Sequence, residues 1–555
     1  MSKNKIKDED INIQEWEIWH TYTSYIQAKN LDLKYVAKYL VKSGIASLAF
    51  HKDGSTYWME KEGLCEGITH IFYQSDKDFN IYELKSESEN DVDLGEYARE
   101  ALDMACWFRS REKRFFSHDL LLPPSYIRVY LEQCIFYSES TKSRIKIYPI
   151  ILLYESGVVI VEFRTLSPKQ DITVNQFIES HVNLFNQTFD KLVVPPSLAK
   201  IAVEFLHLLD SKLNIFQRFD HIRRIRFHND VITDLTEIDD DGDFRFKLAP
   251  LSTSGKDSES ESLSSFFLIL LNTIAGIISK PRSILGFLIW GHKELPKLGT
   301  YWTGKPHIYL IKFDDQKETS NENEESHGLV FGRIIMRVES PEPEAALNNL
   351  PNDSRVFPDY SAYISSQASL WVWSLHGHKQ RGSFANKNHA DLIYAPQSTI
   401  ELLEYLYMLH RRLLNTIEAY YNADQIIQIR KDLVNLDQAM EEVSKFGEIT
   451  SLLKQGWDAM GLPSLKYRIN ESLKIQESMS LIYETRLRMK SNRAIAILFG
   501  FLAFPPFAYQ VLKPLWLYAD FPRPENESAF SLILLAVSFS VLSALVIALL
   551  KFFRI

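Results

Sequence analysis

The chain of 555 residues carries 62 lysines and arginines against 71 aspartates and glutamates, a formal net charge of -9. This acidic balance argues against direct nucleic-acid binding, because a protein that neutralises phosphates normally has a basic excess. The three cysteines show no C-x-x-C spacing, which argues against a zinc site and suits a reducing compartment. The N-terminus lacks the apolar segment of a secretory signal, so we expect it to stay in the cytoplasm.

The pattern over residues 1–395 predicts a cytoplasmic α+β body, a mixed sheet flanked by helices. Helical periodicity marks residues 35–44 and 94–116, and short β-rich runs lie at 43–50 and 68–74. These elements alternate along the first part of the chain, as expected when helices cover a sheet.

A hairpin is predicted where two β-rich runs, 145–154 and 158–163, are separated by three residues that end in a glycine. Helical sequence resumes at 174–235. An acidic and serine-rich stretch follows at 237–262, which we interpret as solvated loops where two subdomains would meet.

Residues 265–278 are apolar, but a run of 14 residues is too short to cross a bilayer. It is therefore predicted to be a buried core helix, with a membrane-surface or re-entrant segment as the alternative. Residues 307–313 and 328–338 are interpreted as a strand pair around an acidic loop, and residues 360–375 as one or two further strands.

Residues 299–305 nearly match a phosphate-binding loop, but Pro306 replaces the serine or threonine and no strand leads in. His376, His378 and His389 lie among basic residues that would oppose a metal cation, so we expect no metal site. The sequence also lacks the common nucleophile, zinc-protease and dinucleotide-binding motifs. We therefore expect neither an enzyme nor a bound cofactor.

Two basic clusters are candidate sites for an anionic ligand such as a phosphate, because guanidinium groups bind phosphate oxygens bidentately. The alternative for the first cluster is an exposed helix face that pairs with nearby acids. The candidate ligand-binding residues are Arg218, His221, Arg223, Arg224 and Arg226 in the first cluster, and His378, Lys379 and Arg381 in the second.

Residues 396–493 are predicted to form a helical hairpin and a stalk, because no proline or glycine interrupts the chain from Leu465 to Arg493. The 3–4 spaced seam of the stalk starts apolar and becomes polar at Gln476, Ser480 and Tyr483. A polar seam fits a hydrated channel in a symmetric bundle, and it equally fits a solvated face of a helix that packs elsewhere.

Residues 494–555 are predicted to form a transmembrane hairpin with spans at 494–512 and 529–550, both without charge. Basic residues flank both outer ends, which predicts a multi-pass protein of the plasma (inner) membrane with both termini in the cytoplasm. Pro505 and Pro506 should kink or locally open the first span, which favours a span packed inside an oligomer or lining a pore.

This layout resembles the CorA family of divalent-cation channels, most closely over residues 398–555. The resemblance implies a homo-pentamer in the lipid membrane, whose first spans surround one pore. It also implies that the pore is lined by Asn492, Ala496, Phe499, Ala503 and Pro506, below the polar stalk positions Gln476, Ser480 and Tyr483.

The family's Gly-Met-Asn signature is missing, and residues 510–516 read QVLKPLW instead. The chain is therefore more similar to the divergent CorA-like effectors found beside type III CRISPR systems. That resemblance implies an antiviral channel opened by a small nucleotide messenger, a conjugate of S-adenosylmethionine and AMP. The alternatives are a Mg²⁺ transporter and a tail-anchored binding protein.

Overall fold

The computed structural model describes these residues: 11–27, 31–60, 63–73, 80–86, 94–115, 124–138, 143–168, 170–194, 236–238, 244–246, 262–279, 296–299, 302–355, 358–377, 379, 390–419, 426–427, 430–435, 437 and 447–552. They divide into two compact units. The first, here called the body, comprises residues 1–414 and 432–467, and the second, here called the helical unit, comprises residues 415–431 and 468–555.

The body contains a large mixed sheet, as predicted, whose central strand is β1 (Asn12–Gln27). On one side β1 pairs with β9 (Val158–Leu166), and on the other with β15 (Trp302–Phe313). Every described pairing is antiparallel except that of β15 with β17, which is parallel.

Beyond β9 the pairing order is β8, β6, β2, β3, β4 and β5, and beyond β15 it is β17 and β16. The bounds of these strands are β2 (Ala46–His51), β3 (Ser55–Glu60), β4 (Gly63–Tyr73), β5 (Asn80–Ser86), β6 (Tyr126–Leu131), β8 (Arg144–Tyr154), β16 (Tyr360–Ile364) and β17 (Ser369–Trp373). Shorter strands pair with the ends of β1 and β8 or with one another: β7 (Cys134–Tyr137), β10 (Ile172–Thr173), β11 (Lys191–Val193), β12 (Thr236–Ile238), β13 (Phe244–Phe246) and β14 (Lys297–Leu298).

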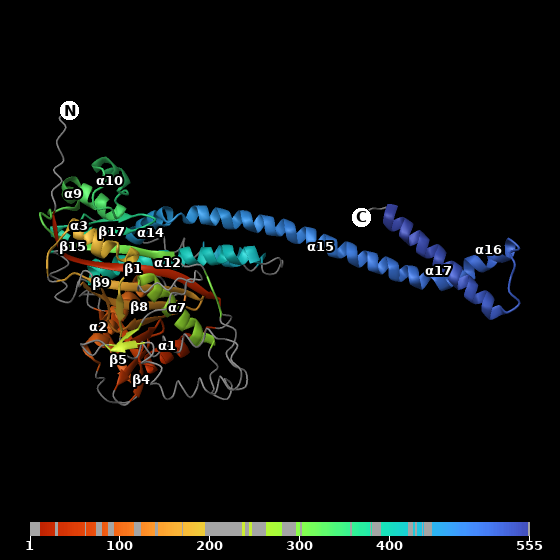
Figure 1. The fold of residues 1–555 in the computed structure, drawn as a ribbon, viewed down its shortest axis with the longest axis horizontal. Helices are drawn as coiled ribbons and strands as arrows, with labels where there is room; N and C mark the ends of the chain where they lie inside the picture. Colours follow the sequence, from red (N-terminus) through yellow and green to blue (C-terminus); the bar gives the residue numbers. More distant parts are fainter. Residues whose placement is uncertain are drawn as a thin grey trace. The chain divides into compact units, whose positions relative to one another are not determined.

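One face of the sheet is apolar and is covered by helices (Figure 1). Val159, Val161 and Phe163 of β9 pack with α1 (Leu33–Lys42) and α7 (Leu263–Ser279) in one core cluster. Ile308 and Leu310 of β15 pack with α9 (Ser320–Met336) and the short α3 (Val174–Phe177) in a second. Burial of these side chains supplies the main hydrophobic stabilisation of the body.

The opposite face carries the alternate residues of the same strands, because successive side chains of a strand point to opposite faces. Glu162 of β9 lies between two core residues in sequence, yet it contacts Gln397 of α12 (Ala390–Ala419). Arg128 of β6 contacts both α12 and Phe108 of α2 (Glu96–Phe115). This face is therefore covered by α12 and α2.

Several predicted elements are confirmed. The hairpin of β8 and β9 turns at residues 155–157, and Gly157 has a φ of 85°. A side chain there would lie 2.2 Å from the carbonyl oxygen of Ile26, so the turn fits closely against the end of β1. The apolar run at 265–278 forms the buried helix α7, and residues 360–375 contain the two strands β16 and β17.

The prediction of a strand at 328–338 is wrong, because this segment belongs to helix α9. Thr319 caps the helix by accepting a hydrogen bond from the backbone N–H of Glu322, whose side chain accepts one from the backbone N–H of Thr319. This capping box was present in the acidic stretch interpreted as a loop. The apolar run looked β-rich because one side of α9 packs on the sheet.

Two other interpretations need correction. The stretch 174–235 is not helical throughout, since β11 occupies 191–193, and its residues 195–235 lie outside the described residues. The predicted loops at 237–262 contain parts of the paired strands β12 and β13. The central strand β1 was not predicted, because its polar positions hid a strand that is buried on both faces.

The helical unit contains most of one long helix, α15 (Leu462–Phe507), which confirms the uninterrupted stalk. The helix continues through Pro505 and Pro506, and the π-helical η3 (Ala508–Leu512) follows directly. Two prolines remove two backbone donors, which accounts for a change of hydrogen bonding at this point. Next come α16 (Lys513–Tyr518) and α17 (Glu527–Phe552).

Candidate functional site

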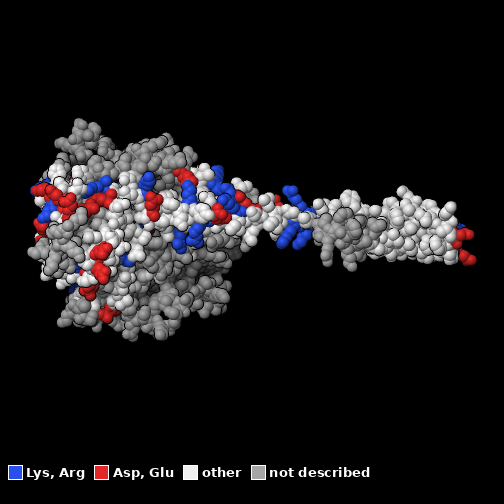
Figure 2. Space-filling model, turned by 90° about the horizontal axis from the view of Figure 1, so that it is seen from above, with Lys and Arg blue, Asp and Glu red and all other residues white. Residues whose placement is uncertain are grey.

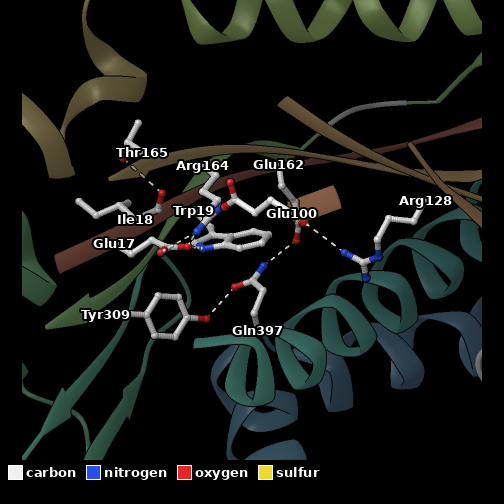
Figure 3. A network of polar contacts seen from close by, with 10 residues as sticks. All are labelled: Glu17, Ile18, Trp19, Glu100, Arg128, Glu162, Arg164, Thr165, Tyr309 and Gln397. Atoms are coloured by element: carbon white, nitrogen blue, oxygen red, sulfur yellow. Dashed lines mark hydrogen bonds and ion pairs between the residues drawn. The ribbon is translucent and has the colours of Figure 1, made fainter. Parts of the chain in front are cut away.

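The clearest concentration of polar chemistry in the body is a buried layer of charged and hydrogen-bonding side chains between the sheet and α12, here called the charged layer (Figure 3). Its members come from four strands and one helix. They are Glu17 and Thr23 of β1, Arg128 of β6, Glu162 and Arg164 of β9, Lys305, His307 and Tyr309 of β15, and Gln397, Glu401 and Glu404 of α12.

At one end of the charged layer, Arg164 binds Glu17. The Nε of Arg164 lies 2.6 Å from Oε1 of Glu17, and its Nη2 lies 3.2 Å from Oε2. The same Glu17 Oε1 accepts a hydrogen bond from the indole of Trp19, and Arg164 also reaches Glu100 of α2 at 3.2 Å. Both acceptor oxygens of Glu17 are therefore satisfied inside the protein.

In the centre, Arg128 forms a bidentate pair with Glu401 of α12. Its guanidinium carbon lies 3.8 Å from the ring centroid of Phe108, a cation–π contact. A second carboxyl group, that of Glu162, lies 3.9 Å from Nη1 of the same arginine. One buried cation thus faces two carboxyl groups.

Gln397 connects the helix to two strands, as Figure 3 shows. Its Nε2 donates to Oε1 of Glu162 at 2.6 Å, and its Oε1 accepts from the hydroxyl of Tyr309 at 2.7 Å. The side chain of Gln397 can bind both residues at once, because its amide group contains a donor nitrogen and an acceptor oxygen. Gln397, Glu401 and Glu404 recur at helical spacing and so share one face of α12.

At the other end, Lys305 lies 3.7 Å from Oε1 of Glu404, whose Oε2 accepts from the hydroxyl of Thr23 at 3.3 Å. Lys305 Nζ and Glu404 Oε1 have no hydrogen-bond partner among the described residues. Nearby on β15, Nδ1 of His307 lies 2.6 Å from Oγ of Ser369. The Lys305–Glu404 contact is therefore longer than the contacts of Arg128 with Glu401 and of Arg164 with Glu17.

Burial shifts the pKa values of several residues in the charged layer. Desolvation, followed by the neighbouring Glu401, raises the pKa of Glu162 well above its ordinary value. Desolvation lowers the pKa of Lys305 and holds the pKa of His307 well below its ordinary value, so His307 is neutral. Four buried carboxyl groups then meet three buried cations. A proton on Glu162 makes the layer electrically neutral, which a low-dielectric interior strongly favours.

These geometries indicate a positioning element, because Glu401 and Glu404 of α12 are matched to cations that lie on strands of the sheet. The sequence contained an indication of this layer that the sequence analysis did not take into account. Arg128, Glu162 and Arg164 each interrupt an otherwise apolar β-rich run, and a charge in such a run is normally paired when buried.

Most of the predicted ligand-binding residues lie outside the described residues, namely Arg218, His221, Arg223, Arg224, Arg226, His378 and Arg381. Lys379 is described and is 60% exposed, in an ion pair with Glu318 at 2.9 Å. The resemblance of residues 299–305 to a phosphate loop has no structural counterpart, because residues 302–305 lie in β15 and Lys305 points into the charged layer.

The predicted pore-lining residues all lie in α15, but at two angular positions. At about 100° per residue, the stalk group of Gln476, Ser480 and Tyr483 is roughly 150° away from the group at 492–506. Gln476 and Ser480 are 9% and 8% exposed within the single chain, and Tyr483 is 60% exposed. In the second group Asn492, Phe499, Ala503 and Pro506 are exposed, and the side chain of Ala496 is outside the description.

Within the described residues, one helix is long and apolar enough to cross a membrane, at Glu527–Ala544, with a mean hydropathy of 1.8 and 17% of its residues buried. The first predicted span lies in α15 and η3, where several side chains are not described. Comparison with family models, curated proteins and solved structures finds no match for the chain.

We predict that Arg128→Met destabilises the body by about 3–5 kcal/mol, because it leaves Glu401 buried without its cation. The double variant Arg128→Met/Glu401→Gln should recover most of that loss. Urea unfolding of the detergent-solubilised chain measures both. Lys85→Met is the matched control, since Lys85 pairs with Glu83 at 3.4 Å on the surface. A loss for Arg128→Met no larger than that of the control would contradict the role of the charged layer.

We predict that Glu162→Gln becomes increasingly more stable than the wild type as pH rises above about 4.3, the ordinary pKa of glutamate. The folded state holds a proton on Glu162 that the unfolded chain releases, so wild-type stability falls as pH rises through the raised folded-state pKa. The amide keeps the shape and cannot ionise. Melting temperatures from pH 4 to 8 test this, with exposed Glu83→Gln as control, and parallel curves for variant and wild type would refute it.

Proposed function

We propose that this chain is a CorA-like membrane channel whose helical unit crosses the plasma membrane and whose body responds to a cytoplasmic ligand. The observation that carries the proposal is the surface of α15, η3 and α17, where large apolar side chains are exposed, among them Leu498, Phe499, Leu502, Leu532 and Val541. Such a surface is costly in water and favourable in lipid.

The packing of the end of the chain supports a transmembrane hairpin. Ala508 of η3 packs with Phe530 and Leu534 of α17, and Trp516 of α16 lies 6.1 Å from Phe530. The two segments thus pack against each other and keep apolar side chains on their outer surfaces. Arg486, Arg488 and Lys490 before the first segment fit a cytoplasmic stalk under the positive-inside rule.

The pore in this proposal is lined by the group at 492–506, which faces one side of α15. No carboxylate occurs between Glu484 and Asp520. A Mg²⁺ transporter, the alternative of the same family, would bind its cation through oxygen ligands, and along this segment the proposed pore offers the amide oxygen of Asn492 but no carboxylate. A channel without selectivity for Mg²⁺ is therefore preferred.

A tail-anchored binding protein is the second candidate, favoured by one observation. Gln476 and Ser480 are covered within a single chain, and Glu477 beside them binds Arg430 at 2.5 Å. Packing inside one subunit thus covers the first two positions of the polar stalk seam, while Tyr483 is exposed.

Cysteine accessibility separates the two candidates. Ala503→Cys should react with a water-soluble thiol reagent and change the conductance of the reconstituted chain, because this residue faces the proposed pore. Leu498→Cys, about 140° away on the same helix, should face lipid and stay unmodified. No conductance and no reaction at either position would favour the tail anchor.

For the ligand, we propose a nucleotide messenger of the S-adenosylmethionine–AMP type, acting in type III CRISPR defence. Coupling requires an element that the ligand moves between two states. Helix α12 is suited to this, because it carries Glu401 and Glu404 of the charged layer and extends beyond Leu414 into the helical unit.

We expect an adenine-containing messenger to raise the melting temperature of the solubilised chain, because a ligand that binds only the folded state stabilises it. The shift should be lost in Arg223→Gln/Arg224→Gln and kept in Lys431→Gln, which removes an exposed cation elsewhere. No shift, with no nucleotide found by mass spectrometry in the purified protein, would remove the messenger from the proposal and leave the channel to be tested by conductance.

A further inference from the structure

Three cations on α15, here called the basic collar, have no visible partner: Arg486, Arg488 and Lys490. All are exposed, and none lies within ion-pair distance of an acid that the structure describes. Elsewhere on α15 the exposed cation Lys474 is paired with Glu471 at 2.6 Å. In Figure 2, lysine and arginine atoms gather in a band on the helical unit, and the described surface beyond it shows little charge until acidic atoms at its far end.

Two of the three collar cations share one side of α15. Arg486 and Lys490 are one helical turn apart, and position 493 of the helix falls within the same arc of about 60°. This arc is turned roughly 130° from the residues at 492–506 that the proposed pore uses. On that geometry Arg486 and Lys490 face outward, shortly before the uncharged segment that begins at Ala494, whereas Arg488 lies on the side of the proposed pore.

We propose that the basic collar binds the headgroups of anionic phospholipids. This inference rests on the proposed function, in which the helical unit crosses a membrane. It adds the class of lipid that the surface of the helical unit binds. Charge complementarity carries it: unpaired cations followed immediately by apolar side chains match a phosphate followed by acyl chains. The long arginine and lysine stems allow the charges to reach the headgroup level while the stems lie along the helix.

The full chain, solubilised in a neutral detergent, tests the proposal. Its melting temperature is titrated with phosphatidylglycerol, with phosphatidylcholine and with inorganic phosphate alone. Phosphatidylglycerol should stabilise the wild type at the lowest concentration, and 0.5 M salt should weaken the effect. Because one juxtamembrane cation is worth about a fivefold change in affinity, Arg486→Gln/Lys490→Gln should weaken binding roughly 25-fold.

Two variants control for loss of charge or fold. Arg486→Lys/Lys490→Arg keeps both charges and should bind as the wild type does. Lys431→Gln/Arg468→Gln removes two exposed cations elsewhere in the helical unit and should also leave binding unchanged.

Three outcomes overturn the inference. Equal effects of the two lipids, or an unaffected glutamine variant, show that the collar does not recognise the headgroup. An equal effect of inorganic phosphate identifies a site for a soluble anion. A chain that stays soluble without detergent overturns the proposed function, and the lipid surface with it. If lipid binding fails while conductance is present, the channel stands without it.

Discussion

A charged group that leaves water needs a partner close at hand, and this constraint governs how the sheet of the body meets α12. Arg164 is matched within the sheet by Glu17, while Arg128 has its bidentate partner, Glu401, on the helix and Lys305 is matched by Glu404 of the same helix. Sliding α12 by one turn, about 5.4 Å, would break both contacts at once. The helix therefore has one position on this face that leaves no buried charge alone.

The two faces of the sheet contribute differently to the stability and specificity of the fold. The apolar face packs against α1, α7 and α9 and provides the hydrophobic stabilisation, which is non-directional. The polar face fixes where α12 lies on the sheet, because each hydrogen bond requires one particular partner. Glu162 is the exception to strict pairing, since Arg128 already serves Glu401. Desolvation and the neighbouring Glu401 therefore raise the pKa of Glu162 well above its ordinary value.

The helical unit differs from the body in the placement of its apolar side chains. Its large side chains face outward, and α17 is held to η3 and α16 by an apolar cluster and by a hydrogen bond between the hydroxyls of Tyr509 and Ser531. Such a surface needs an apolar solvent, which is the physical basis of the proposed membrane location. Helices α12 and α15 each contribute residues to both units. Helix α12 thus connects the charged layer to the helical unit, and α15 separately connects the body to the segment of the proposed pore.

The sequence alone determined the local elements whose patterns are strong. The uninterrupted stalk, the core helix α7 and the hairpin of β8 and β9 follow from periodicity, run length and a glycine turn. Strand β1 and helix α9 were missed, because β1 is buried on both faces and α9 is apolar where it meets the sheet. In both cases tertiary contacts override the usual alternation.

Only the tertiary structure decided the charged layer. Glu162 and Gln397 are separated by 235 positions, and Arg128 and Glu401 by 273. No local pattern relates residues so distant, although each charge in an apolar run indicated that some partner must exist. Which partner it is depends on strand register and on the position of α12, and both are set by packing of the whole body.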